Sequence, residues 1–308
     1  MQHFEQAIHS FAPGSKLLSS RALEGGISAT MTLLEIELPD GKVQKAVARK
    51  PGAWRYRDNP NAAKDEFRVI EALQTTSVRV PGPLALIELG PDIHDSYYLL
   101  EFQEGAPDLV VKNRDAFLRS FARQLAEIHR VDFAKHGLEF LEHQTLSIKE
   151  KDGIPLNSLR ESHVINTLKA MTPLSESNSP TLLHGDYWPG NVLWRNEEII
   201  SVIDWENAII GDPLADLASC RLDVLWILDM EAMEEFTERY QAEMNLDMTD
   251  LPSWDLWASL RLIRNLKECV TAYPKLGRSD ITEETMSSDL LLFIESALAR
   301  CKTASTHP

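Results

Sequence analysis

The segment LLHGDYWPGNVLW, residues 182–194, constrains the fold and the chemistry of this chain more than any other. It carries a histidine, His184, an aspartate two positions later, Asp186, and an asparagine, Asn191, beyond a short turn. A second apolar run, ending SVIDWE, places Asp204 behind another strand. Phosphoryl transfer uses this set of groups. One carboxylate can accept the proton of an attacking hydroxyl, while a second carboxylate and an amide oxygen hold Mg²⁺ at the phosphates.

A simpler interpretation of this segment is that its histidine and first aspartate only cap a turn. For a lone His-x-Asp that interpretation would be preferred. Here the polar positions stand at matched spacing between apolar strands, and Gly190 supplies a turn that can bring Asn191 back beside Asp186. The segment therefore predicts a catalytic loop and not an ordinary turn.

The spacing of these residues is that of a known catalytic loop. His184-x-Asp186, followed by Asn191 after four intervening positions, matches the protein-kinase pattern HRD-(x)₄-N. The form HGDYWPGNVL, followed by VIDWE, resembles the aminoglycoside phosphotransferase family, which includes choline, homoserine and macrolide kinases. The resemblance implies Asp186 as the catalytic base, Asn191 and Asp204 as Mg²⁺ ligands, and His184 as a brace of the loop. The Trp-Glu pair after Asp204 is usual for this family and not for protein kinases, which argues against a protein substrate.

The first hundred residues predict a small antiparallel sheet. Apolar or alternating runs separated by Gly-Gly and Pro-Asp-Gly turn signals are typical of hairpins. Five strands are expected, at residues 16–26, 29–38, 43–50, 84–89 and 97–102. Asn59-Pro60 predicts the start of one helix that runs to about Gln74, and residues 4–11 can form a short additional helix.

The rest of the chain is expected to be mostly helical. Helices are predicted at residues 113–130, 156–170, 213–230, 231–245, 254–272 and 286–302. The predicted fold class is therefore α+β, a protein-kinase-like two-lobed fold with a small antiparallel-sheet lobe carrying one helix and a larger helical lobe. The division predicted is 1–103 for the nucleotide-binding lobe and 104–308 for the catalytic and substrate-binding lobe.

A glycine-rich turn in the small lobe is a candidate phosphate cradle. Gly25, Gly26 and Ser28 lie between the first two predicted strands, where backbone N–H groups could face phosphate oxygens. A Gly-Gly pair alone is more often just a hairpin turn, and the full G-x-G-x-x-G pattern is missing from this stretch.

The end of the third predicted strand supplies a basic residue for the nucleotide. Side chains alternate along a strand, so only one of Arg49 and Lys50 can face the cleft. The resemblance favours Arg49, on the α- and β-phosphates. Glu66 lies on the inward stripe of its predicted helix, where a carboxylate needs a partner, and Arg49 is the expected one. An exposed glutamate at the edge of the stripe is the common alternative.

The segment after the fifth predicted strand is the expected hinge between the lobes. The resemblance implies that main-chain groups of Glu101 and Gln103 pair with the edge of the adenine base, whatever their side chains. ATP is preferred to GTP only as a default.

A few further polar and aromatic residues are interpreted mainly as structural. Asp216 lies one turn inside a helix that begins at Asp-Pro, and the resemblance implies that it braces the catalytic loop. A histidine placed as His129 is, near the end of a helix, is more often a hydrogen-bonded core or helix-end residue than a ligand. Trp188 could border the acceptor pocket, and Trp254 and Trp257 lie where acceptors often bind in such kinases, although packing is the favoured role of all three.

The composition narrows the classes of molecule that this chain is expected to bind. A formal net charge of −16 disfavours nucleic acid and anionic membranes, because both are polyanions. No apolar run is long enough to span a bilayer, and the N-terminus does not resemble a secretory signal. The three cysteines form no zinc or disulfide pattern, which is typical of a cytoplasmic protein. The acidity is interpreted first as a solvated surface and second as a field that attracts cationic substrates.

Two functions from different classes remain open. The first is an ATP- and Mg²⁺-dependent kinase that phosphorylates a hydroxyl of a small molecule. The acceptor could be an amino-sugar, an amino-alcohol such as choline or ethanolamine, homoserine or a sugar. The second is a catalytically silent nucleotide-binding protein or scaffold, which ranks lower because such proteins usually lack the base or a metal ligand. The sequence predicts no oligomeric state.

Overall fold

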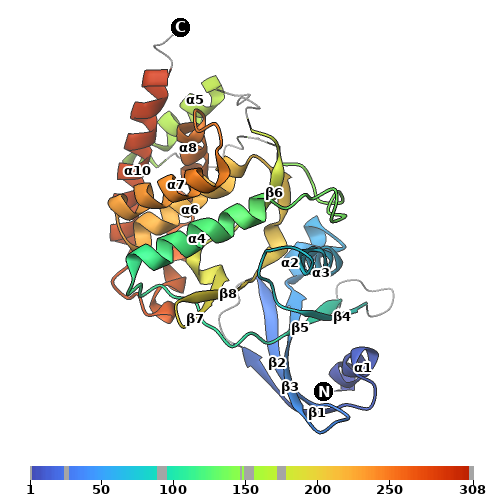
Figure 1. Ribbon diagram of the computed structural model, residues 1–308. Helices are drawn as coiled ribbons and strands as arrows, with labels where there is room; N and C mark the ends of the chain where they lie inside the picture. Colours follow the sequence, from blue (N-terminus) through green and yellow to red (C-terminus); the bar gives the residue numbers. More distant parts are fainter. Residues whose placement is uncertain are drawn as a thin grey trace.

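The structure is a computed structural model that describes residues 2–23, 28–88, 96–145, 148, 156–171 and 178–304. An antiparallel sheet lies at one end of the molecule and a larger helical body at the other (Figure 1). The predicted α+β arrangement of a small sheet lobe and a larger helical lobe is confirmed. The boundary predicted at residues 103 and 104 falls in the segment that leads from the sheet to the helical body.

The sheet has five strands in the order β1-β2-β3-β5-β4, and neighbouring strands are antiparallel. The strands are β1 (Lys16–Leu23), β2 (Ala29–Glu37), β3 (Val43–Pro51), β4 (Pro83–Ile87) and β5 (Tyr97–Glu101). The accompanying helices are α1 (Gln2–Phe11), α2 (Ala53–Asp58) and α3 (Ala62–Leu73). All five predicted strands are confirmed.

The helix predicted to open at Asn59-Pro60 is present but begins two residues later, at Ala62, and the short helix α2 before it was not predicted. Asn59 is in an extended conformation, as the residue before a proline prefers, so a helix cannot pass through it. Its side-chain oxygen instead accepts a hydrogen bond from the N–H of Asn61, at 2.8 Å, and closes a turn. The Asn-Pro pair therefore separates α2 from α3, and Asn61 occupies the N-cap position of α3 without a capping hydrogen bond from its side chain.

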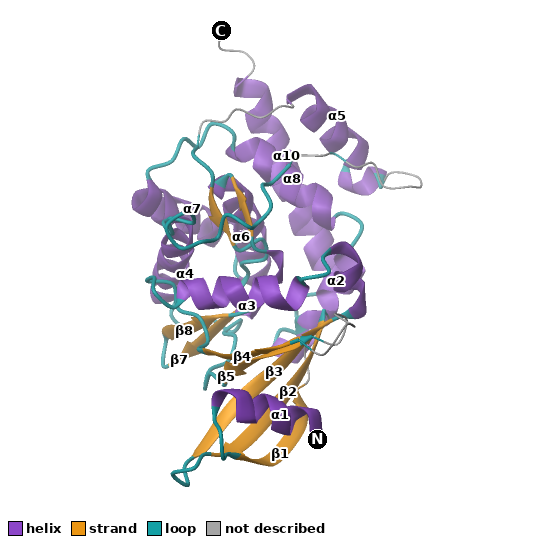
Figure 2. Cartoon of the chain, turned by 90° about the vertical axis from the view of Figure 1, so that its right-hand side faces the viewer, coloured by secondary structure: helices purple, strands orange, loops and turns teal. Residues whose placement is uncertain are grey.

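The two faces of the sheet have different partners. Ala46 and Ala48 of β3 belong to an apolar cluster with α1, which crosses that face (Figure 2). Arg49 has the opposite orientation, because successive side chains of a strand alternate, and it contacts Glu66 of α3. The register of the sheet therefore directs Arg49, and not Lys50, toward α3 and the helical lobe.

The helical lobe is built around a buried central helix. Its helices are α4 (Arg114–His129), α5 (Glu161–Met171), α6 (Pro213–Ile227), α7 (Met230–Met244), α8 (Leu251–Leu262), α9 (Leu266–Cys269) and α10 (Glu283–Ala304). Short 3₁₀ turns lie at Asn157–Leu159, Pro189–Asn191, Trp205–Asn207, Val270–Ala272 and Pro274–Leu276. The helix α6 is buried along almost its whole length and contacts α7, α8 and α10. The single helix predicted at 254–272 is wrong, because the chain turns between α8 and α9.

Two small two-stranded sheets hold residues 182–194, the predicted catalytic segment. The strands β7 (Val192–Arg195) and β8 (Glu198–Val202) pair with each other, and β6 (Thr181–Leu183) pairs with β9 (Ile209–Gly211). The strand β9 was not predicted, because three residues are too few for a strand pattern and their pairing with β6 cannot be seen in the sequence. Its pairing with β6 sets the start of the catalytic segment beside the start of α6.

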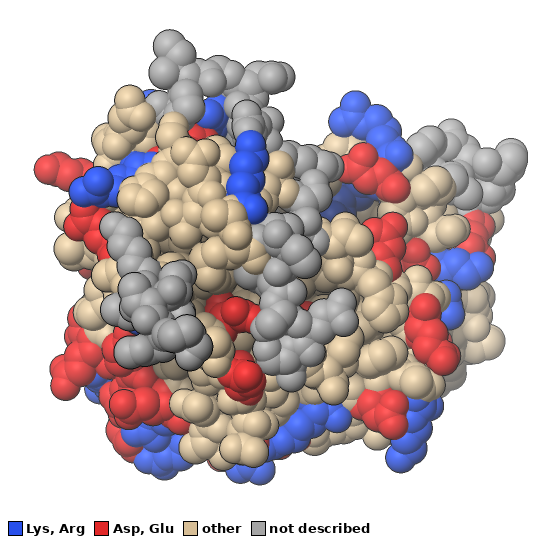
Figure 3. Space-filling view, turned by 90° about the horizontal axis from the view of Figure 1, so that it is seen from above, with Lys and Arg blue, Asp and Glu red and all other residues tan. Residues whose placement is uncertain are grey.

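The surface of the helical lobe carries both signs of charge. Viewed from its far end, acidic and basic side chains of the described residues are interspersed (Figure 3). In the part of the chain that the structure describes, no helix has the length and apolarity that crossing a membrane requires.

Candidate active site

The loop between β6 and β7 presents Asp186 and Asn191 side by side. The amide nitrogen of Asn191 donates to the carbonyl oxygen of Asp186 at 3.0 Å and to its carboxylate oxygen Oδ2 at 3.2 Å. Gly190 makes this return possible, because a Cβ there would lie only 2.1 Å from the ring of Trp188. Since the amide nitrogen of Asn191 is used by Asp186, its amide oxygen points away from that carboxylate.

The backbone before Asp186 also requires a glycine. Gly185 has a φ of +78°, and a Cβ at this position would lie 2.3 Å from the carbonyl oxygen of Asn207. The catalytic loop therefore packs directly on the turn that follows Asp204, and only a residue without a side chain permits that approach.

Asp216, at the start of α6, holds the loop from below. Its carboxylate accepts the N–H of His184 at 2.8 Å and that of Gly185 at 3.0 Å. His129 contributes a third contact, with Nε2 at 3.3 Å from Oδ2, while its other ring nitrogen is 2.6 Å from the hydroxyl of Tyr240. Burial alone would raise the pKa of Asp216, but the partners His129 and His184 hold that pKa below its usual range. These contacts are those of a structural brace.

His184 ties the loop to the next strand. Its ring nitrogen Nε2 lies 3.0 Å from the carbonyl oxygen of Ile203, and burial lowers the pKa of the ring. A neutral ring with one N–H fits a donor to that carbonyl. The other ring nitrogen, Nδ1, accepts from the N–H of Asp186 at 3.3 Å, so both ring nitrogens bond to the main chain of the loop and of the next strand.

Asp204 follows β8 and lies beside Asn191. The pairing of Val192 with Val202 and the bond from the N–H of Ile203 to the carbonyl of Asn191, at 2.9 Å, bring the two residues to the same end of the hairpin. Asp204 has a φ of +69°, in the left-handed region. Such strain costs about 1–3 kcal/mol and is found where function requires one orientation.

Arg49 joins the two lobes at Asp204. Its Nη2 lies 2.6 Å from Asp204 Oδ1 and 2.8 Å from Glu206 Oε2, and its Nε lies 3.0 Å from Glu66 Oε1. The predicted contact between Arg49 and Glu66 is therefore present. A second arginine, Arg55 of α2, lies with Nε 3.9 Å from the Glu206 carboxylate.

The cluster carries more negative than positive charge. Two guanidinium groups face the carboxylates of Glu66, Asp204 and Glu206. Burial and the charge of Asp204 raise the pKa of Glu66 and of Glu206, against the lowering effect of Arg49. Burial and the same charge raise the pKa of Asp186 to about 6. Such raised pKa values among neighbouring carboxylates are typical of functional sites.

These groups suit a magnesium ion. Oxygen ligands from Asp204 and Asn191, in a region of excess negative charge, match the preference of Mg²⁺ for one or two protein oxygens completed by water and phosphate. Among the described residues no group of three or more His, Cys, Asp or Glu side chains forms a metal centre of protein ligands alone. Asp204 and Asn191 would therefore supply two oxygens to the ion, and water or phosphate would supply the others.

The small lobe is described in part. Gly25 and Gly26 lie outside the described residues, whereas Ser28 is placed and its side chain bonds to Glu206. At the predicted hinge, the N–H of Glu101 already donates to Gly82, at 2.8 Å, and the carbonyl of Gln103 accepts from Gly105, at 3.0 Å. For a base, this leaves the carbonyl of Glu101 and the N–H of Gln103.

The other side of Asp186 is lined by groups that the sequence analysis did not single out. Burial, and then the charge of Asp186, raise the pKa of Asp223 on α6, while Arg261 opposes the shift. Tyr273 packs edge-on against Trp188, with ring centroids 5.9 Å apart. The one sequence signal for Asp223 was a carboxylate two turns after Asp216 on a mostly apolar helix.

The two tryptophans predicted near the acceptor on the late helix, Trp254 and Trp257, are buried and half-buried. Trp254 is buried and packs against Trp257, with ring centroids 5.8 Å apart, which is a packing role. Trp257 also stacks on Arg261, whose guanidinium carbon lies 5.5 Å from the ring centroid.

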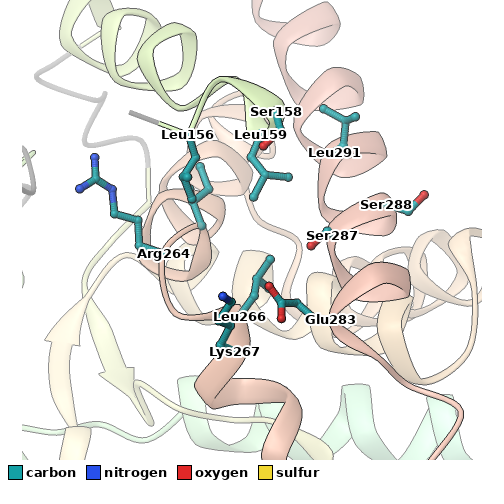
Figure 4. A pocket seen from close by; sticks show the side chains of 11 residues that line it. Leu156, Ser158, Leu159, Arg264, Leu266, Lys267, Glu283, Ser287, Ser288 and Leu291 are labelled. Carbon is teal, nitrogen blue, oxygen red and sulfur yellow. The ribbon is translucent and has the colours of Figure 1, made fainter. Parts of the chain in front are cut away.

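A separate hollow lies in the helical lobe. Its volume is about 710 Å³, and it is bounded by the 3₁₀ turn Asn157–Leu159, the turn between α8 and α9, and the first turns of α10 (Figure 4). Leu159 and Leu266 form part of its apolar wall, and Glu283 and Ser287 lie on its polar side. No predicted site residue lines it.

The fold and the site define a phosphotransferase of the protein-kinase-like class, as the sequence predicted. The chain belongs to the phosphotransferase enzyme family APH, whose model matches residues 21–262. The prediction of a small-molecule kinase is confirmed at the level of this class.

Known proteins that resemble the chain fall into two groups. The GDP and kanamycin complex of APH(2")-IIia has a TM-score of 0.65 and 17% identity, with 97% of this chain and 99% of that chain covered. The ternary complex of APH(4)-Ia with AMP-PNP and hygromycin B has a TM-score of 0.61 and 16% identity, over 99% and 98%. Acyl-CoA dehydrogenase family member 10 of Mus musculus is 25% identical over 72% of this chain. The chain spans about a quarter, 24%, of that relative's length.

Proposed function

We propose that this protein is a kinase that transfers the γ-phosphoryl group of ATP to a hydroxyl of a small molecule, with Mg²⁺. The observation that carries the proposal is the convergence of Asp186, Asn191 and Asp204 at one end of the β7–β8 hairpin, in a cluster with excess negative charge. Arg49, on β3 of the sheet lobe, contacts this cluster at Asp204.

Asp186 is the proposed catalytic base. Its carboxylate accepts the proton of the acceptor hydroxyl as the oxygen attacks the γ-phosphorus, and a pKa near 6 leaves it ionised at neutral pH. Asn191 fixes that carboxylate through its amide N–H. Asp204 and the Asn191 amide oxygen would hold Mg²⁺, which neutralises charge on the β- and γ-phosphates.

The small lobe is proposed to bind the nucleotide. Arg49 faces the α- and β-phosphates and Glu66 orients it. Phosphate contacts by Gly25, Gly26 and Ser28 stay a prediction. The carbonyl of Glu101 and the N–H of Gln103 form an acceptor–donor pair, which matches the amino group and ring nitrogen of adenine. Guanine presents the opposite pattern at these positions, so we favour ATP as the donor. A cytoplasmic location stays a prediction.

The acceptor is proposed to lie between Asp186, Trp188, Asp223 and Tyr273. The two carboxylates suit an amine-bearing acceptor, such as an amino-sugar or amino-alcohol. Arg261 beside them favours a second class, an acceptor with a carboxylate or phosphate. The name of the dehydrogenase relative supports testing hydroxylated acyl chains within this second class, because this domain is only a part of that longer protein.

The test is ADP release by the purified full chain with Mg²⁺ and ATP or GTP. The panel holds amino-sugars, amino-alcohols, homoserine, sugars and hydroxylated acyl acids with their CoA thioesters. Turnover should appear with one class and fall by about 10²–10⁴-fold in Asp186→Asn, the usual effect of losing a catalytic base. Wild-type turnover in that variant would refute the base. Mg²⁺-dependent nucleotide binding without turnover on any member would favour the silent scaffold.

A further inference from the structure

Glu206 lies where the two lobes meet, two residues after Asp204. Its carboxylate is 2.8 Å from Nη2 of Arg49, and its carbonyl oxygen accepts a hydrogen bond from Arg55. Arg55 also donates to the side-chain oxygen of Asn207, at 3.2 Å. One short turn of the helical lobe therefore receives cations from β3 and from α2.

One nitrogen of Arg49 is shared between two carboxylates. The Nη2 atom lies 2.6 Å from Asp204 and 2.8 Å from Glu206. Only 7% of the Arg49 side chain is exposed, so its guanidinium cannot exchange a lost partner for water. A divalent cation on Asp204 must compete with Arg49 for the same carboxylate.

We propose that Glu206 is a positioning residue that holds Arg49 when the divalent cation takes Asp204. The inference rests on the proposed function, since it needs Asp204 to be a metal ligand. Glu206 and Glu66 contact Arg49 at different nitrogens, so the guanidinium stays paired after Asp204 leaves it. Its place toward the phosphates is then kept.

Loss of Glu206 should strengthen the hold of Arg49 on Asp204. With Glu206 neutral, Nη2 keeps Asp204 as its one charged partner among these contacts, and the metal must break that buried pair. Removing Arg49 should have the opposite effect, because Asp204 is then released. The two effects are coupled through one nitrogen, which simple loss of charge near a metal would not produce.

The experiment measures Mn²⁺ binding to the nucleotide-free full chain by the electron paramagnetic resonance signal of free Mn²⁺. We expect Glu206→Gln to weaken binding about tenfold, in the range of one charge-assisted hydrogen bond. Arg49→Met should tighten binding. In the Arg49→Met background, Glu206→Gln should change the affinity by less than about threefold. Glu198→Gln, an exposed residue at the start of β8, is the control and should bind as the wild type does.

A second variant separates position from charge. Glu206→Asp keeps the charge but shortens the side chain, so it should weaken Mn²⁺ binding as Glu206→Gln does. It also serves if Glu206→Gln fails to fold by circular dichroism.

Two results overturn the proposal while the metal site survives. One is an equal weakening by Glu206→Gln with and without Arg49, which would make Glu206 a direct ligand or a simple charge. The other is wild-type binding by Glu206→Asp. Absence of Mn²⁺ binding by the wild type, with and without ATP, would instead remove the proposed metal site and this inference with it.

Discussion

Two buried polar clusters lie on opposite sides of the catalytic loop and differ in how fully they are paired. Around Asp216, one carboxylate receives two backbone N–H groups and His129, and its pKa lies below its usual range. Around Arg49, three carboxylates share two guanidinium groups, and the pKa values of Glu66 and Glu206 are raised.

The difference teaches which cluster is scaffold and which is site. A paired buried network stabilises a unique geometry, whereas unbalanced buried charge is costly unless a partner arrives. The first cluster is complete within the chain. In the second cluster, we propose that a divalent cation bound with a nucleotide balances the excess negative charge.

The largest expected effect is on the complete cluster. Asp216→Ala leaves two buried N–H groups without an acceptor and should lower the free energy of unfolding by about 3–5 kcal/mol. Urea unfolding of the purified variant measures this. Asp223→Asn, on the same helix, is the matched control and should stay within about 0.5 kcal/mol of the wild type or above it. A small loss in Asp216→Ala would mean that the brace is not a scaffold.

The next largest effect tests whether ligands complete the second cluster. The Mg²⁺–ATP complex, at about 1,000 times its dissociation constant, should add about 4.1 kcal/mol to wild-type stability. Asp204→Asn should lose the part of this gain that depends on Mg²⁺, while Glu198→Gln keeps it. Thermal unfolding with and without EDTA measures the gain. An undiminished Mg²⁺ effect in Asp204→Asn would place the metal elsewhere.

A smaller effect follows from the raised pKa of Asp186. Because its folded pKa is about 6, above the ordinary 3.8, the proton favours the folded state and stability is lost as pH rises through that window. Asp186→Asn avoids this cost, so it should be more stable by about 2–3 kcal/mol at pH 8 and equal to the wild type below pH 4.

The measurement is the melting temperature of both proteins from pH 4 to pH 8, with EDTA present. A gain of stability together with lost turnover would mark Asp186 as a residue that trades stability for activity. A pH-independent difference between the two proteins would contradict the burial of this charge.

The smallest effect concerns the acceptor side of the loop. Once the panel identifies an acceptor, Asp223→Asn should raise its KM by about 3–10-fold and leave kcat near the wild-type value, as expected for one lost hydrogen bond. Steady-state kinetics measures the split. A fall in kcat with unchanged KM would move Asp223 from acceptor binding to the reacting atoms.

Much of the scaffold was readable from residue patterns. The spacing of His184, Asp186 and Asn191 predicted a loop that the hydrogen bonds of Asn191 now describe, and strand alternation with the family resemblance selected Arg49 over Lys50. The break at Asn59 and Pro60 was misread because the same pair can open a helix or separate two helices. The pair separates two helices here because the residues before it form α2. That helix is held by tertiary packing, such as the burial of Tyr56, which the local sequence does not show.

The sequence by itself determined the chemical inventory of this protein, because the spacing of polar groups between apolar strands is a local property. The tertiary structure alone decided which charges meet. Glu206 and Asp204 receive Arg49 from a strand more than a hundred residues earlier, and Asp223 reaches the neighbourhood of Asp186 only because α6 is buried beneath the loop. Electrostatic coupling falls with distance in space and not along the chain, so no local pattern could have shown it.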